Sequence, residues 1–177
     1  METIKISDHQ PNQTYAYLFD TNVWLYIYGP VAGTNTWKQK KYAQLLQSII
    51  DRKATIYITS LVLAEYINRV LRIGFGQWKD NNNLYAADFK HDYRNTDHYR
   101  DVLADAIAQV DEILKISQRR PDDFNAIDIS DVLQSMEQSS DYNDSYLVKC
   151  CERGKIKFVS DDNDISNIKS SITLIKA

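Results

Sequence analysis

The sequence is poor in the residues that mark several classes of protein. Its 177 residues include 5 Gly, 3 Pro and 2 Cys, which excludes collagen-like, low-complexity and disulfide-scaffold proteins. No apolar run approaches the ~18 residues that a membrane helix needs, and residues 1–10 lack the apolar core of a signal peptide. Cys150 and Cys151 are neighbours, which is poor geometry for a disulfide. We therefore expect a cytoplasmic protein without a membrane segment, and both cysteines in its core.

The charge of the chain has no strong excess of one sign. The 21 Lys and Arg residues stand against 24 Asp and Glu, a net charge of −3, so the chain as a whole does not attract nucleic acid. Hydrophobic residues make up 44% of the sequence, as in ordinary globular proteins. Because one domain takes roughly 100–200 residues and no linker-like stretch divides the chain, we expect a single domain over residues 1–177.

Short apolar runs alternate with segments of helical spacing. We expect strands at Tyr15–Phe19, Thr55–Ile58, Ala126–Ile129, Ile156–Val159 and Ile172–Ile175. We expect helices over residues 21–28, about 36–51, about 61–71, 103–114 and 144–153, and a short one opening at Ser130 or Asp131. Gly154 is the expected cap of the helix over 144–153. The alternation predicts an α/β protein with a mainly parallel sheet.

Acidic residues lie where functional groups gather in such a sheet, at the carboxyl ends of the strands. Asp20 follows the first expected strand, and Asp162 and Asp164 follow the strand at 156–159. Glu65 and Asp144 lie near the starts of two helices. Each acid alone has an ordinary explanation as a turn, cap or solvated residue. Together they predict a shared rim of carboxylates.

Carboxylates at one rim repel one another unless a cation neutralises them. Oxygen ligands without a nearby pattern of His or Cys suit Mg²⁺ or Mn²⁺ rather than zinc. Such a cation can activate water and hold the oxygens of a phosphodiester. Arg69, Arg72 and Lys149 lie near the expected rim and are candidates to hold phosphates, although solvated helix charges are the commoner explanation.

Four segments together resemble a known family. They are Phe19-Asp20-Thr21-Asn22-Val23, Ser60 to Glu65, Asp144 to Cys151, and Phe158 to Ile165. In this order they resemble the PIN domain family, and in particular the VapC-type ribonuclease toxins of bacterial toxin–antitoxin modules. The resemblance extends from about Tyr15 to Ile175, except for the middle segment. It implies a three-layer α/β/α sandwich with a mainly parallel central sheet.

The resemblance also implies an activity, a metal-dependent endoribonuclease that hydrolyses RNA phosphodiester bonds with Mg²⁺ or Mn²⁺. The four acids of the family, which are its catalytic residues and metal ligands, fall on Asp20, Glu65, Asp144 and Asp162. A homodimer and a small antitoxin protein are the implied partners.

Further polar residues of the family pattern surround these acids. Asn22, Ser160 and Asp164 fall on positions that orient ligands or water. Asp141 lies three residues before Asp144 and would share its helical face. The third acid is therefore either Asp144 or Asp141 on the sequence alone.

The segment from Gly74 to about Thr96 is a polar and aromatic insert, longer than compact members of the family carry. Its Asn run and charges argue against a second core, and its aromatic residues could stack on unpaired bases. We expect it to cover one side of the catalytic groove or the dimer edge and to supply no metal ligand.

Two other functions stay open. A haloacid-dehalogenase-type phosphatase also has an Asp after its first strand, but it needs a second acid two residues later, where this chain has Asn22. Glu65 would have no role in it. The other alternative is a non-catalytic PIN-like domain that binds RNA or protein.

Overall fold

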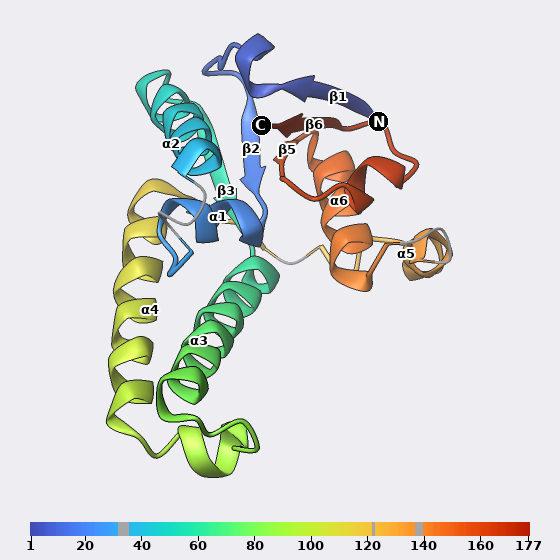
Figure 1. Cartoon of the computed structure of the whole chain (residues 1–177). Helices are drawn as coiled ribbons and strands as arrows, with labels where there is room; N and C mark the ends of the chain where they lie inside the picture. The colour runs from blue at the N-terminus through green and yellow to red at the C-terminus, as the bar shows by residue number, and fades with distance from the viewer. Residues whose placement is uncertain (32–35, 122, 137–139) are drawn as a thin grey trace.

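The computed structural model describes residues 1–31, 36–121, 123–136 and 140–177. At its centre lies a six-stranded sheet of order β1-β6-β5-β2-β3-β4, in which the paired strands are parallel (Figure 1). The strands are β1 (Glu2–Lys5), β2 (Ala16–Phe19), β3 (Thr55–Ile58), β4 (Gln118–Arg119), β5 (Lys157–Val159) and β6 (Thr173–Lys176). The parallel sheet predicted from the alternating pattern is confirmed.

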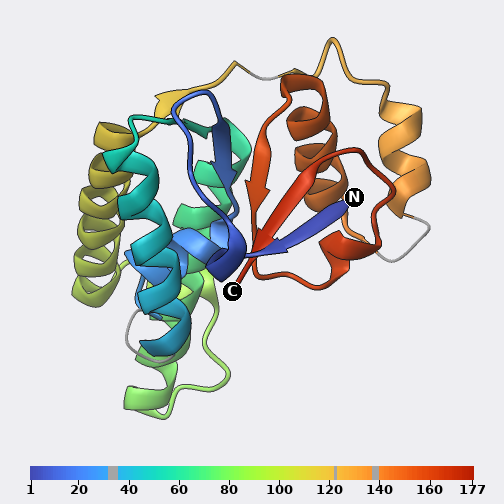
Figure 2. The ribbon, with the colours of Figure 1, turned by 90° about the horizontal axis from the view of Figure 1, so that it is seen from above.

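Helices lie on both sides of this sheet. They are α1 (Thr21–Ile27), α2 (Thr36–Asp51), α3 (Ser60–Asn82), α4 (Asp97–Ile116), α5 (Ile129–Met136) and α6 (Tyr142–Gly154), with short helical segments η1 (Ile6–Asp8), η2 (Phe89–Tyr93) and η3 (Asp164–Asn167). Figure 2 shows α1 to α4 on one side and α5 and α6 on the other. This is the α/β/α arrangement that the family resemblance implies.

The core follows from burial of the sheet on both faces. Tyr17, Leu18 and Phe19 are consecutive in β2 and are all fully buried. Consecutive buried residues are typical of a parallel strand that helices cover on both faces. Cys150 and Cys151 are also buried, as expected. No helix within the described ranges is long and apolar enough to cross a membrane.

The sheet register brings the site together. β2 pairs with β3 on one side and with β5 on the other, with Phe19 opposite Val159. The backbone N–H of Asp20 donates to the Val159 carbonyl at 2.9 Å. The carboxyl ends of these three strands therefore meet at one rim, where α1, α3 and the loop after β5 begin.

Both edge strands are absent from the sequence prediction. β1 and β4 are largely exposed, so they lack the apolar run that reveals a central strand. The predicted strand at Ala126–Ile129 is wrong, because α5 begins at Ile129. Ile127 and Ile129 pack against Val132 and Tyr146, so this apolar run joins α5 to α6 and not to the sheet.

The expected cap at Gly154 is also wrong. α6 includes Gly154, and Lys155 takes the left-handed conformation at φ 51° and ψ 42°. A Cβ at Gly154 would lie 2.7 Å from Cδ1 of Ile156. Glycine at this position therefore provides space for the following strand rather than a backbone conformation.

The insert forms a helical hairpin with its own small core. α3 continues through Gly74 to Asn82, and α4 returns beside it (Figure 1). Phe89 and Tyr93 are buried with Leu71 in a second apolar cluster. The expectation of no second core is therefore wrong, because the aromatic residues fill the space between the helices. Their burial also removes Phe89 and Tyr93 as free platforms for bases.

Candidate active site

Asp20 lies at the centre of the rim, between the end of β2 and the start of α1. It is the N-cap of α1, and its Oδ1 accepts from the Thr21 backbone N–H at 2.7 Å. Its Oδ2 accepts from Ser160 Oγ at 2.7 Å and from Asn22 Nδ2 at 2.6 Å. Only 5% of Asp20 is exposed. A buried carboxylate with three donors has a fixed orientation.

Hydrogen bonds of Asn22 and Ser160 connect the end of β2 to the end of β5. Asn22 Nδ2 also approaches Ser160 Oγ at 3.3 Å, and Asn22 Oδ1 accepts from the Asp161 backbone N–H at 3.2 Å. Ser160 Oγ accepts from the Asp162 backbone N–H at 3.1 Å. These two residues thus set the position of Asp20 and of the loop that carries Asp162.

The pKa of the Asp20 carboxyl is raised to about 6, chiefly because the group is buried. The hydrogen bonds from Ser160 and Thr21 oppose this shift, whereas the charges of Glu65 and Asp162 add to it. Asp20 after β2, Glu65 on α3 and Asp162 in the loop after β5 therefore lie close enough to repel one another.

Asp144 belongs to the same group of charges. Its pKa is raised to about 7, first by burial, then by Asp141, and further by Asp20, Asp162 and Glu65. The four acids predicted from the sequence therefore interact electrostatically, although they come from four separate segments.

Asp141 has a different role from Asp144. It is the N-cap of α6, and its Oδ1 accepts from the Asp144 backbone N–H at 2.9 Å. The Asp141 side chain is exposed, whereas Asp144 is half-buried. The geometry favours Asp144 as the third acid, with Asp141 fixing the start of the helix that carries it.

The four acids do not form a ready-made metal site. Across the part of the chain that the structure describes, no three His, Cys, Asp or Glu side chains are placed to hold one ion. The donor set still suits a hard divalent cation, because it consists of carboxylates only. Burial and, to a lesser extent, the charges of neighbouring acids raise the pKa of Asp20 and that of Asp144. A bound cation would neutralise the negative charge that these acids share.

A groove of about 1030 Å³ opens beside the acids, between α1 and α3. Glu65, Asn68, Arg69 and Arg72 line its α3 side. Arg69 Nε lies 3.1 Å from Glu65 Oε1. Lys149 is not among the residues that line this groove. Its Nζ lies 3.6 Å from Asp131 Oδ2 and 3.7 Å from Glu152 Oε2.

Comparison with known families identifies the fold. The sequence profile of the PIN domain matches residues 17–170. The chain belongs to the PIN domain family. Membership of this family argues against the phosphatase alternative. The structure adds that Asn22, at the position where such an enzyme needs an acid, donates a hydrogen bond to Asp20.

Two solved structures resemble this PIN domain. One is VapBC2 from Rickettsia felis, determined with a DNA fragment from their promoter, with a TM-score of 0.57 and 15% identity over 92% of this chain and 99% of that chain. The other is PAE2754 from Pyrobaculum aerophilum, with a TM-score of 0.43 and 15% identity over 90% of this chain and 89% of that chain. At this identity the first likeness concerns the fold alone. No curated protein sequence matches the chain significantly.

Asp164 lies outside the group of interacting acids in this PIN domain. It is exposed at the start of η3, and its backbone N–H donates to Asp162 Oδ1 at 2.8 Å. Its charge is absent from the causes that shift the pKa of Asp20 and that of Asp144. Asp164 therefore supports Asp162 through its backbone.

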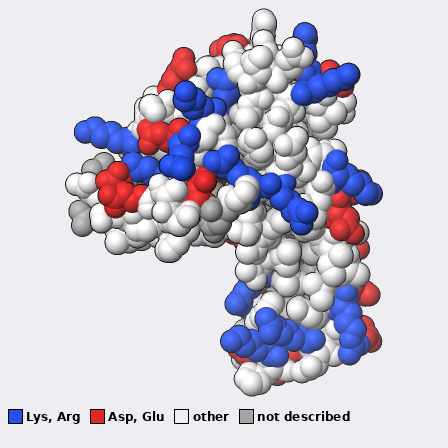
Figure 3. All heavy atoms as spheres, turned by 180° about the vertical axis from the view of Figure 1, so that it is seen from behind, with Lys and Arg blue, Asp and Glu red and all other residues white. Residues whose placement is uncertain are grey.

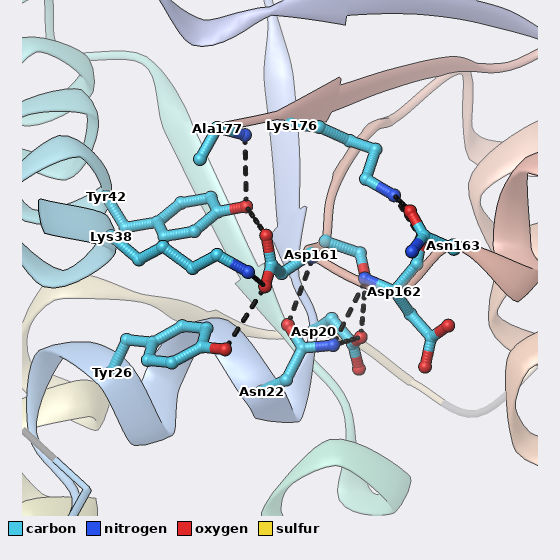
Figure 4. Close-up of polar contacts among 11 residues, drawn as sticks. Asp20, Asn22, Tyr26, Lys38, Tyr42, Asp161, Asp162, Asn163, Lys176 and Ala177 are labelled. Atoms are coloured by element: carbon cyan, nitrogen blue, oxygen red, sulfur yellow. Dashed lines mark hydrogen bonds and ion pairs between the residues drawn. The ribbon is translucent and has the colours of Figure 1, made fainter. Parts of the chain in front are cut away.

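Asp161 is a polar residue that the sequence did not single out. Its carboxylate forms an ion pair with Lys38 and accepts from the hydroxyls of Tyr26 and Tyr42, each at 3.1 Å (Figure 4). This network ties the loop after β5 to α1 and α2, so Asp161 points away from the acids that Asp162 joins. In the sequence, this network is indicated only by the spacing of Lys38 and Tyr42, which are four residues apart and therefore share a face of α2.

Proposed function

We propose that this PIN domain is a metal-dependent endoribonuclease that hydrolyses RNA phosphodiester bonds with Mg²⁺ or Mn²⁺. The observation that carries the proposal is the convergence of four acids from separate segments at one rim of the sheet. Burial first, and then the charges of neighbouring acids, raise the pKa of Asp20 to about 6 and that of Asp144 to about 7. A cluster of buried carboxylates with raised pKa values is unfavourable for stability and is typical of a functional site.

In this proposal Asp20, Glu65, Asp144 and Asp162 hold the cation. A divalent cation held there would supply the activation of water and the neutralisation of charge on the phosphate. Asn22 and Ser160 orient the Asp20 carboxylate through the hydrogen bonds described above. Asp141 and Asp164 act more remotely, as a helix cap and as a backbone donor to Asp162.

We further propose that the protein is the toxin of a toxin–antitoxin module. The support is membership of the PIN family and a fold like that of VapBC2. In this proposal the chain forms a homodimer in the cytoplasm and binds a small antitoxin protein. Co-purification with the product of a short neighbouring gene tests this part separately.

The nuclease proposal is tested with single-stranded RNA and added Mn²⁺. We expect cleavage that EDTA stops and that Asp20→Asn abolishes. The matched control is Asp105→Asn, which removes the same charge from an exposed position on α4. Cleavage by the Asp20→Asn protein at the parental rate would contradict the assignment. Absence of Mn²⁺ binding by the parent protein would favour a non-catalytic PIN-like domain, and a phosphoryl group trapped on Asp20 would favour a phosphatase.

A further inference from the structure

One face of α3 leads from the acids along the groove. Glu65, Asn68, Arg69 and Arg72 line the groove together, because residues three, four and seven positions apart share a helix face. Arg72 lies about 10 Å along the helix axis from Glu65, at ~1.5 Å per residue. Arg72 therefore lies in the same groove as Glu65 but too far along the helix to contact it.

The insert holds the Arg72 side chain in place. Cζ of Arg72 lies 4.2 Å from the centroid of the Phe89 ring, and Cζ of Arg94 lies 5.3 Å from the same centroid. The Phe89 ring is fixed in turn, since it contacts Phe75 and Tyr93 at centroid distances of 5.4 and 5.7 Å. A guanidinium stacked on an immobile ring keeps its orientation, and its N–H groups stay available.

The charge of Arg72 has no acidic partner among the residues that the structure describes. Neither Arg72 nor Arg94 forms an ion pair with a residue in the described ranges, whereas Arg69 is paired with Glu65. Both Arg72 and Arg94 are exposed. A planar guanidinium with free donors is well suited to a phosphate group.

The free end of the hairpin contains acidic as well as basic residues. Figure 3 shows Lys and Arg side chains gathered at this end, seen from behind. Two of the acids bind backbone groups of the insert: Asp88 Oδ1 accepts from the N–H groups of Lys90 and His91, each at 2.8 Å, and Asp92 accepts from the Asp88 N–H at 2.6 Å. These carboxylates therefore serve the fold of η2 and leave the guanidinium groups exposed.

The remaining walls of the groove indicate which form of RNA it accepts. Leu25, Val31, Leu61 and Ile73 contribute apolar surface to it. Unpaired bases can lie against apolar surface, whereas a duplex keeps its bases stacked inside and presents only its backbone and edges. Apolar walls beside Arg69 and Arg72 therefore fit single-stranded RNA.

We propose that Arg72, oriented by Phe89, binds a backbone phosphate of single-stranded RNA next to the phosphate that is cleaved. The proposal rests on the nuclease function proposed above and gives the insert a role in it. Arg72 contacts the substrate, and Phe89 is a positioning residue that acts through Arg72. The insert thereby contributes to RNA binding without supplying a metal ligand.

The test measures RNA binding without cleavage. A labelled single-stranded RNA of about 12 nucleotides is titrated with the full chain in EDTA, at several salt concentrations, by fluorescence anisotropy. Arg72→Gln should weaken binding about five- to tenfold and reduce the slope of log K against log salt by about 0.7, the value for one phosphate contact on a single strand. Lys115→Gln is the charge-matched control, because Lys115 is exposed on α4 and pairs with Glu112.

Phe89→Leu tests the positioning role and keeps an apolar side chain in the second cluster. It should weaken binding by itself, but Arg72→Gln combined with Phe89→Leu should bind no more weakly than Arg72→Gln, since the ring acts through the arginine. A folded Arg72→Gln protein with the affinity and salt slope of Lys115→Gln overturns the proposal. If Phe89→Leu fails to fold, the Arg72→Gln result decides alone.

The two proposals fail in different ways. If Mn²⁺-dependent cleavage occurs but Arg72→Gln leaves binding and its salt slope unchanged, the nuclease function stands and the role of Arg72 is wrong. If binding depends on Arg72 but no RNA is hydrolysed, the binding site stands and the nuclease function is wrong. Equal binding of duplex RNA would overturn the single-strand assignment.

Discussion

The Ser160 hydroxyl donates to the Asp20 carboxylate at 2.7 Å, across 140 positions of sequence. This bond is one of the interactions that lower the pKa of Asp20 against the larger effect of burial. Because Ser160 Oγ also accepts from the Asp162 backbone, one hydroxyl holds two of the proposed metal ligands in position.

Ser160→Ala should shift the pH dependence of cation binding to higher pH. Loss of the donor raises the pKa of Asp20 further, so the pH midpoint of Mn²⁺ binding should move up by about one unit. A hydrogen bond to a charged group contributes ~1.5–3 kcal/mol, and one pH unit corresponds to ~1.4 kcal/mol. Calorimetric titrations between pH 5.5 and 8.5 measure the midpoint. Ser48→Ala on the exposed face of α2 should leave it unchanged, and a midpoint lowered by Ser160→Ala would contradict the role of the bond.

Asp141→Asn and Asp144→Asn should separate a helix cap from a metal ligand. Asn is nearly as good an N-cap as Asp, so Asp141→Asn should retain both the fold and most of the Mn²⁺ affinity. Asp144→Asn should lose Mn²⁺ binding, because Asp144 is the acid that interacts with Asp20, Glu65 and Asp162. The opposite pattern in the same titration would make Asp141 the third ligand.

Asp144→Asn should also stabilise the metal-free protein, and the gain should depend on pH. The pKa of Asp144 is raised from 3.8 to about 7 in the folded state, so the native carboxyl binds a proton more readily than the unfolded one. Ionisation therefore removes stability as pH rises from about 4 to 7. The variant should exceed the parent by about 1 kcal/mol at pH 8, allowing for solvent screening, and by little at pH 4. Urea unfolding in EDTA at both values measures the difference, and an equal gain at both would contradict this explanation.

Arg69→Gln should strengthen cation binding. Arg69 pairs with Glu65 at 3.1 Å, so it competes with a cation for that carboxylate and adds positive charge beside the acids. An exposed pair contributes ~0.2–1 kcal/mol, which corresponds to an increase in Mn²⁺ affinity of up to about fivefold. Arg100→Gln, which removes an exposed charge from α4, is the control. A weaker Mn²⁺ affinity for Arg69→Gln would mean that the arginine orients Glu65 for the metal.

Two glycines of α3 should respond to alanine in opposite ways. A Cβ at Gly74 would lie 2.8 Å from Val102 Cγ1 and 2.9 Å from the Tyr93 hydroxyl, so Gly74→Ala should destabilise the hairpin by about 1–3 kcal/mol. A Cβ at Gly76 meets no atom of the described residues within 4 Å, so Gly76→Ala should stabilise the hairpin by up to about 1 kcal/mol through helix propensity. Thermal unfolding of the pair measures both effects. Equal stability of the two variants would contradict the close approach of α4.

The central strands and the acids could be found by reading the sequence alone. Tyr15–Phe19 contains no charged residue, and Lys157 alone interrupts the apolar residues of Ile156–Val159. Such runs are typical of strands that are covered on both faces, and this signal is local. Once the strand at Tyr15–Phe19 is recognised, Asp20 is placed at its carboxyl end. The order of the four acids along the chain was sufficient to indicate the PIN family.

Only the tertiary structure decided which residues act together. The edge strands β1 and β4 are exposed and hold their place through pairing with β6 and β3, which leaves no apolar pattern to read. The cap at Asp141, the ion pair between Lys38 and Asp161, and the stacking of Arg72 on Phe89 each depend on how a side chain points or on which distant segment lies beside it. Periodicity reports the face on which a residue lies. Periodicity does not indicate which side chain of another element a residue contacts, because that contact forms only when the two elements pack together.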